Sequence, residues 1–171
     1  RSASSVSMRF RLIDRIDEIE PGVRIAAVKA LTGSEDYLKD HFPLFPVMPG
    51  VLMLEAMYQA SAWLVRSTDH FAYALVLLKE ARNVKYADFV APGQVLHVTA
   101  EILKREGDLT TLKAQGMVAG HVAVSARLIL ERGQIADRIA TRAESDPFTR
   151  KRMKEYFDEI YQPALPEQAL V

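Results

Sequence analysis

The stretch from Val51 to Val65 carries apolar side chains on almost every face of a helix, interrupted only by isolated polar residues. A helix on the surface of a protein keeps one polar half, so a helix with this pattern must be covered on nearly all sides. Pro49 suits the first helical position. The pattern therefore predicts a buried helix from Pro49 to about Arg66.

Much of the remaining chain alternates between apolar and polar residues, which is typical of strands with one buried face. Before the helix, Val23–Thr32 has this pattern, whereas Phe10–Ile19 is mixed and residues 33–40 are polar and turn-like. After the helix, the alternation predicts five strands: Ala72–Lys79, Ala81–Ala87, Gln94–Lys104, Leu109–Val118 and His121–Glu131. The connections between the last three are short enough for hairpins. One buried helix followed by antiparallel strands predicts an α+β fold in which a curved sheet wraps the helix.

Residues 132–171 form an extension after the last predicted strand. Asp146-Pro147 is a helix-start signal and Pro163 a stop signal, which predicts a helix over about 146–161. An apolar stripe at helical spacing is formed by Met153, Tyr156, Phe157 and Ile160. The other face carries Arg150, Lys151, Arg152 and Lys154. We expect the stripe to dock on the outer face of the sheet or across a dimer partner; the alternative is a position near the mouth of a substrate tunnel.

Composition narrows the class of protein. Of 171 residues, 49% are hydrophobic and 26% charged, which excludes a disordered or collagen-like chain. The 22 basic and 22 acidic residues cancel, so the chain lacks the basic excess of a nucleic-acid-binding protein. Without cysteine, disulfides and thiolate chemistry are excluded. Since no secretory signal or membrane span is visible, we expect a cytoplasmic protein whose residues 1–9 are disordered or foreign to it.

Glu55 is the most informative position on the buried helix. A carboxylate among apolar side chains is expected to be neutral, paired or at a cavity. Gln59 follows one turn later on the same side of the helix, where it can orient the carboxyl group. The alternative is that Glu55, Gln59 and Arg66 form a narrow solvated stripe.

The start of this helix is a second candidate site. With Met48 at the N-cap, no side-chain acceptor is available for the N–H groups of Gly50 and Val51. Such free donors suit an oxyanion or a polarised carbonyl, although water is the common occupant. His41 lies shortly before, and a lone histidine becomes a candidate base only through the acid and the helix start that follow it.

These residues also resemble a family signature. The runs His41-Phe42-Pro43, Pro46-Val47-Met48-Pro49-Gly50-Val51-Leu52, Glu55-Ala56-Met57 and then Gln59 closely resemble the FabZ/FabA-type 3-hydroxyacyl-acyl-carrier-protein dehydratases. The upstream LIDRIDEIEPG and the downstream VKYADFVAPGQVL are also similar to that family, and the resemblance covers residues 10–131. It implies the hotdog fold, an antiparallel sheet wrapped around one long helix. It also implies a homodimer, or a trimer of dimers, with His41 and the acid contributed by different subunits.

The resemblance assigns roles to residues. His41 would remove the α-proton of a 3-hydroxyacyl thioester, Glu55 would protonate the departing hydroxyl, and the Gly50 N–H would polarise the thioester carbonyl. The Val47 carbonyl would orient the His41 ring, and Gln59 would support Glu55. No metal or other cofactor is needed. Where the family usually has Gly-His or Gly-Asp, this chain has Leu44-Phe45, so we expect a reshaped acyl tunnel lined by Leu44, Phe45, Met48 and Leu54.

The implied partner is acyl carrier protein, which presents its acyl group on a 4'-phosphopantetheine arm. Carrier proteins are acidic and this chain has no net charge, so recognition would need a local basic patch. The candidate patch, for which an ordinary solvated strand edge is the alternative, consists of Lys79, Arg82 and Lys85. Two other functions stay open: a hotdog thioesterase, and a non-catalytic acyl-binding subunit, which would be expected to have lost the histidine or the acid. The acyl-chain length, the pathway and the choice between carrier protein and coenzyme A are also open.

Overall fold

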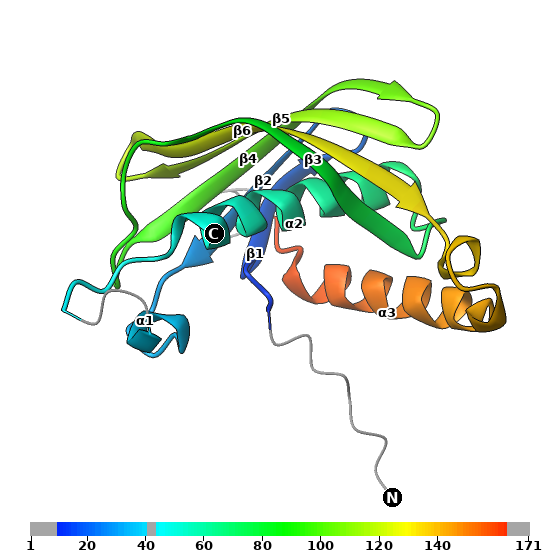
Figure 1. Ribbon diagram of the computed structural model, residues 1–171, viewed down its shortest axis with the longest axis horizontal. Coiled ribbons are helices and arrows are strands. Elements are labelled where there is room, and N and C mark those ends of the chain that lie inside the picture. The colour runs from blue at the N-terminus through cyan, green and yellow to red at the C-terminus, as the bar shows by residue number, and fades with distance from the viewer. Residues whose placement is uncertain (1–9, 41–43, 164–171) are drawn as a thin grey trace, which may run out of the picture.

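The computed structural model of the protein describes residues 10–40 and 44–163. Within these residues, six strands form one antiparallel sheet in the order β1-β2-β4-β5-β6-β3. The strands are β1 Arg15–Glu20, β2 Arg24–Ala30, β3 Leu75–Tyr86, β4 Val95–Glu106, β5 Leu109–Val118 and β6 His121–Gly133. The sheet curves over the long helix α2 (Gly50–Thr68), as Figure 1 shows.

The hydrophobic core lies between the sheet and α2. On the strands, every second side chain points inward, so that Leu96 and Val98 of β4 and Leu128 and Leu130 of β6 are fully buried. From α2, the fully buried residues include Ala56, Met57, Ala60 and Leu64. The expected sheet wrapped around a buried helix is confirmed.

Three parts of the chain differ from the sequence-based expectation. Residues 75–86 form the single strand β3 rather than parts of two, because two β-bulges absorb the breaks in alternation and keep the strand paired with β6. The stretch Phe10–Ile19, in which the sequence shows no clear alternation, contains most of strand β1, which pairs with β2. A β-bulge between Ile16 and Glu18 interrupts the alternation of apolar and polar residues in this strand. The segment expected to be turn-like contains the short helix α1 (Tyr37–Asp40).

The C-terminal extension begins with two short 3₁₀ turns, η1 (Ile135–Asp137) and η2 (Ala140–Arg142), and continues as helix α3 (Ser145–Ile160). Asp146 is not the N-cap that its position before Pro147 suggested. Its buried carboxylate lies in the first turn and accepts hydrogen bonds from the backbone N–H groups of Ile135 and Ala136, at 2.6 and 3.2 Å. The aspartate therefore ties the start of α3 to η1.

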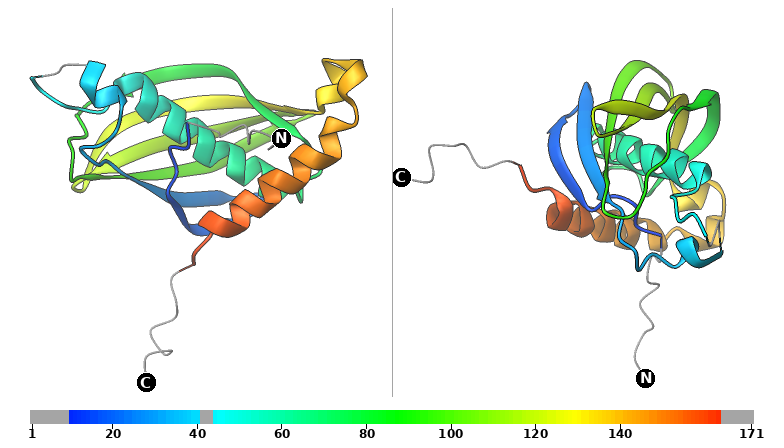
Figure 2. Two further views of the ribbon diagram at one scale, coloured as in Figure 1. Left: turned by 90° about the horizontal axis from the view of Figure 1, so that it is seen from below. Right: turned by 90° about the vertical axis from the view of Figure 1, so that its left-hand side faces the viewer.

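Helix α3 packs against the side of α2 that faces away from the sheet (Figures 1 and 2), not on the outer face of the sheet. Its apolar stripe meets Trp63, whose ring centroid lies 5.2 Å from that of Tyr156 and 6.0 Å from that of Phe157. Beyond the helix, the Gln162 N–H donates to the Ile16 carbonyl at 3.1 Å, beside the edge strand β1. The C-terminal half of α2 thus lies between the sheet and α3, whereas Val51 near its start is exposed. Across the described ranges, no helix is long and apolar enough to cross a membrane.

Candidate active site

Glu55 lies on the side of α2 that faces away from the sheet, and the amide of Gln59 orients it. The Gln59 Nε2 donates to the Glu55 Oε1 at 3.2 Å and to the Phe10 carbonyl at 2.8 Å. The Gln59 Oε1 accepts from the backbone N–H of Leu12, also at 2.8 Å. Because its oxygen is engaged by a backbone donor, the amide must present its NH₂ group to the carboxyl group.

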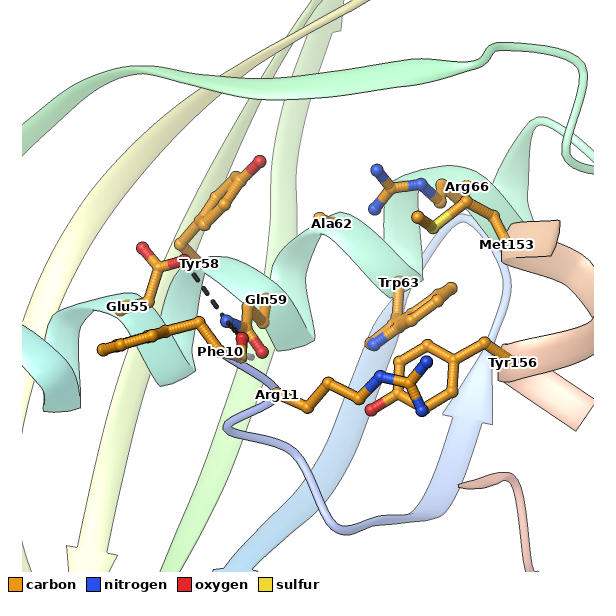
Figure 3. A pocket seen from close by; sticks show the side chains of 10 residues that line it. All are labelled: Phe10, Arg11, Glu55, Tyr58, Gln59, Ala62, Trp63, Arg66, Met153 and Tyr156. Carbon is orange, nitrogen blue, oxygen red and sulfur yellow. Dashed lines mark hydrogen bonds between the residues drawn. The ribbon is translucent and has the colours of Figure 1, made fainter. Parts of the chain in front are cut away.

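A cavity of about 340 Å³ opens beside these two residues (Figure 3). It is bounded by α2, by α3 and by the segment that precedes β1. Besides Glu55 and Gln59, its lining consists of Phe10, Arg11, Tyr58, Ala62, Trp63, Arg66, Met153 and Tyr156. A partly buried carboxyl group at one side of a mainly apolar cavity is an arrangement suited to proton transfer to a bound substrate.

The start of α2 leaves backbone donors free. Pro49 is the N-cap and Gly50 the first helical residue, one position later than expected, because the Pro49 backbone is still extended (ψ 140°). The first N–H bonded within the helix is that of Leu52, which donates to the Pro49 carbonyl at 2.9 Å. In the described part of the chain, no backbone acceptor pairs with the N–H groups of Gly50 or Val51. These donors are therefore available to a carbonyl oxygen.

Gly50 also has a steric role. A side chain at this position would place its Cβ 2.9 Å from the Cε1 of Tyr86, at the end of β3. The absence of a side chain thus lets the Tyr86 ring lie directly over the start of the helix. Glu55 is about 7.5 Å further along the helix axis and its side chain leans back toward the N-terminus, so the acid and the free donors lie at the same end of α2.

Burial shifts the pKa values of two further polar groups that line the cavity. Burial raises the pKa of the Tyr58 hydroxyl, which donates to the Val76 carbonyl of β3 at 2.5 Å. Burial also lowers the pKa of the Arg66 guanidinium, whose Cζ lies 5.3 Å from the centroid of the Trp63 ring. At the rim of the cavity, the Arg11 guanidinium stacks over Tyr156 at 3.9 Å.

The expected catalytic base, His41, lies outside the described residues. Val47, expected to orient it, is buried just before α2. Of the four residues expected to line an acyl tunnel, Leu44 is fully exposed and Phe45 packs edge-on against Phe89 at 6.0 Å. Met48 is buried in the core and Leu54 is partly buried against it. None of the four lines the cavity beside Glu55.

The candidate carrier patch lies on β3, at the edge of the sheet. Lys79, Arg82 and Lys85 are all exposed. The Glu80 carboxylate accepts two hydrogen bonds from Arg82, at 2.6 and 2.8 Å, and raises the pKa of the guanidinium. Arg82 is therefore partly neutralised, and Lys79 and Lys85 provide the remaining positive charge of the patch.

Sequence reasoning did not identify several residues of the cavity. Tyr58, Trp63 and Ala62 belong to the apolar pattern of α2 and looked like core residues. Met153 and Tyr156 were recognised as an apolar stripe, but not as a wall of this cavity. One signal was available: Arg66 is a charged residue on the same side of the apolar helix as Glu55 and Gln59.

A curved antiparallel sheet around one central helix defines a hotdog-fold protein, and solved structures agree. The dehydratase heterocomplex ApeI:P from Xenorhabdus doucetiae aligns with a TM-score of 0.62 at 19% identity, covering 77% of this chain and 89% of that one. A hypothetical thioesterase from Streptococcus pneumoniae, solved with coenzyme A, aligns with a TM-score of 0.55 at 12% identity, covering 69% and 86%. At these identities the likeness shows the fold alone.

Sequence comparison narrows the class to one family. Residues 5–127 match the FabA-like domain, and the chain belongs to the FabA-like family. It is 36% identical over 125 residues to the 3-hydroxyacyl-acyl-carrier-protein dehydratase FabZ of Desulforamulus reducens, covering 73% of this chain and 88% of the relative. The FabZ of Magnetococcus marinus is 40% identical over 122 residues, covering 70% and 80%. The expected family is confirmed, and α3 lies beyond the matched residues.

Proposed function

We propose that the protein dehydrates 3-hydroxyacyl thioesters, carried on acyl carrier protein, to trans-2-enoyl thioesters in fatty-acid or related acyl-chain biosynthesis. The observation that carries this proposal is the Glu55 carboxyl group, oriented by Gln59 at the wall of a cavity and on the same helix end as free backbone donors. The similarity to curated dehydratases over 73% of the chain supports the same reaction.

The reaction divides among three groups. The N–H of Gly50 donates a hydrogen bond to the thioester carbonyl oxygen and stabilises the negative charge that develops there, which acidifies the α-carbon. His41 takes the α-proton as the general base, while Glu55, in its protonated form, gives a proton to the 3-hydroxyl, which leaves as water. The electron pair of the broken C–H bond becomes the new double bond between the α- and β-carbons, and the thioester stays intact.

We infer that two copies of the chain complete each site, with His41 from one subunit and Glu55 from the other. Strand β3 supports a dimer because this twelve-residue strand stands at the edge of the sheet, paired only with β6 among the described strands. A long edge strand offers unpaired backbone groups to a further strand. The choice between a dimer and a trimer of dimers, and the cytoplasmic location, stay predictions.

We also assign recognition of the acidic carrier protein to Lys79, Arg82 and Lys85. All three lie on β3, the strand that ends at Tyr86 over the start of α2. Pairing of β3 with a partner strand uses backbone groups, so the three exposed side chains stay available to a carrier, which would bind near the free donors of Gly50. Electrostatic attraction of this kind mainly raises the rate of encounter and weakens with salt.

The direct test is product analysis by mass spectrometry with 3-hydroxyacyl-carrier protein as substrate. A dehydratase yields an enoyl thioester that has lost one water, whereas a thioesterase yields a free acid and a free thiol, and an acyl-binding subunit yields neither. The His41→Ala and Glu55→Gln variants are expected to lose about 10²–10⁴-fold in turnover while keeping their circular-dichroism spectra. Near-native turnover in either variant would refute the assignment.

Shared sites are tested by mixing the two inactive variants. After subunit exchange, a mixed dimer carries one site with both groups intact, so part of the activity is expected to return. Unmixed His41→Ala and Glu55→Gln proteins, treated identically, are the controls. Verified mixed dimers without recovered activity would place both groups on one chain.

A further inference from the structure

Arg66 occupies an unusual position in the cavity that contains Glu55. Its Nε is fully buried and no described residue accepts a hydrogen bond from it. Among the described residues, no carboxylate lies within 4 Å of its guanidinium, which is the distance that defines an ion pair. The Arg66 side chain as a whole is partly buried. A buried N–H donor without an acceptor is costly, because the hydrogen bond that it makes to water in the unfolded chain is not replaced.

Three other shielded cations in the described part of the chain are paired with carboxylates, whereas the partly buried Arg150 reaches only the amide oxygen of Gln134, at 3.4 Å. The Lys29 Nζ lies 2.8 Å from Glu35, and Arg105 and Arg132 share the carboxylate of Asp69 at 2.9 and 2.7 Å. Among the described residues, Arg66 thus lacks the carboxylate partner that Lys29, Arg105 and Arg132 have. Its neighbours are the rings of Trp63 and Tyr58 and the thioether of Met153, which offer no negative charge.

The position of Arg66 relative to Glu55 suits the two ends of one substrate. Arg66 follows Glu55 by eleven positions, which is about 16 Å along the helix axis. Figure 3 shows the Arg66 side chain directed back over Ala62, with Glu55 and Gln59 toward the other end of the cavity. The small side chain of Ala62 leaves space between Tyr58 and Arg66. The walls between the acid and the guanidinium are mainly aromatic and suit a hydrocarbon chain.

We propose that Arg66 binds a carboxylate at the far end of the acyl chain, so that the enzyme accepts 3-hydroxyacyl thioesters that end in an acid. This inference rests on the proposed dehydratase function and names the substrate class of the same site. The planar guanidinium matches a carboxylate with two parallel hydrogen bonds. Arg11, at the rim of the same cavity, adds a second positive charge.

The phosphate of the carrier arm is the other oxyanion on such a substrate. The acyl chain enters an apolar cavity, whereas the phosphate joins the arm to the carrier protein and stays near the surface. Arg66 has its Nε fully buried and lies against Trp63, which is itself buried beneath α3. The position of the guanidinium therefore favours the end of the acyl chain over the arm.

The test compares matched pairs of 3-hydroxyacyl thioesters of equal chain length, one ending in a carboxylate and one in a methyl group. Each pair is prepared on pantetheine and on 4'-phosphopantetheine, and kcat/KM is measured for the wild type and for Arg66→Met. The substitution is expected to lower kcat/KM for the carboxylate-ended substrate about ten- to a hundredfold, the range for a hydrogen bond to a charged group. It is expected to raise kcat/KM for the methyl-ended substrate, because methionine makes that end of the cavity apolar.

Two further variants sharpen the comparison. Arg66→Lys keeps the charge but not the two parallel hydrogen bonds, so its selectivity is expected to fall between those of the wild type and Arg66→Met. Arg24→Met makes the same chemical change at an exposed position on β2 and is expected to leave the selectivity unchanged. Because Arg66→Met removes a buried N–H donor that lacks an acceptor among the described residues, its Tm is expected to rise.

Several results would overturn the inference. Equal losses for both chain ends would give Arg66 no role in reading the acyl terminus, and a loss that follows the phosphate would assign Arg66 to the carrier arm. A lower Tm or a changed oligomeric state, with unchanged selectivity, would mean that Arg66 pairs with another part of the protein. If the wild type dehydrates methyl-ended substrates but Arg66→Met alters no ratio, only this inference fails. If the wild type dehydrates neither methyl-ended nor carboxylate-ended substrates, the proposed function fails together with this inference.

Discussion

Replacing Phe157 by alanine is expected to release α3 from α2. Phe157 is 6% exposed, and its ring lies 5.2 Å from Phe71, 5.4 Å from Tyr161 and 6.0 Å from Trp63. It is thus a central contact between the C-terminal helix and the rest of the domain. Truncation of this side chain would leave a cavity at the interface between α3 and α2.

The size of the effect follows from the burial. A buried phenylalanine replaced by alanine costs about 3–5 kcal/mol. If α3 unfolds together with the domain, this loss lowers the Tm by about 2–4 °C per kcal/mol for a chain of this size. If α3 separates on its own, its docking equilibrium constant falls between about a hundredfold and a few thousandfold.

Trp63 is the single tryptophan of the chain and is 4% exposed beneath α3, so its fluorescence reports docking directly. In Phe157→Ala we expect a red-shifted emission maximum and stronger quenching by acrylamide. Phe148→Ala is the matched control, because Phe148 lies on the same helix but is 66% exposed, and its cost is expected to be within about 0.5 kcal/mol. Equal quenching and equal Tm in the two variants would refute the docking of α3 on α2.

Three other predictions concern the site. Gln59→Leu is expected to lower the free energy of unfolding in urea by about 1–3 kcal/mol, because the Leu12 N–H loses its acceptor, and to lower kcat, because Glu55 loses its donor. An unchanged free energy of unfolding would contradict these contacts. Gly50→Ala is expected to lower kcat because the added methyl group clashes with the Tyr86 ring, and a second substitution, Tyr86→Ala, should restore turnover. A double variant that is no faster than Gly50→Ala would exclude this clash as the cause. Charge reversal of the β3 patch should raise KM for carrier-bound substrate but not for short coenzyme A analogues, whereas equal effects would argue against the patch; the residues reversed are Lys79, Arg82 and Lys85.

Local sequence determined the elements that depend on local rules. The apolar pattern of α2 requires cover on nearly every side, and the period-two alternation of the strands selects one buried face, so the wrapped helix followed from the pattern. The contact between Glu55 and Gln59 also follows from local geometry, because residues four apart share one face of a helix. Tertiary structure does not alter these relations.

Contacts between distant segments decided the rest. The stripe on α3 showed that this helix docks, but its apolar residues fit the outer face of the sheet as well as they fit α2. The docking position is set by contacts of the α3 stripe with Trp63 and Phe71, which lie far from α3 in sequence. Likewise, the fusion of two expected strands into β3 depends on bulges, which arise only when β6 is paired alongside.

The environment of Arg66 was least accessible from sequence. Its spacing from Glu55 and Gln59 is equally compatible with a solvated stripe and with a cavity wall, because helical periodicity specifies a shared face but not what covers that face. The docking of α3 covers Trp63 and narrows the space around the guanidinium. Sequence by itself therefore determined which side chains lie together on α2, and only the tertiary structure decided which of them lost contact with water, because burial depends on every segment that packs against the helix.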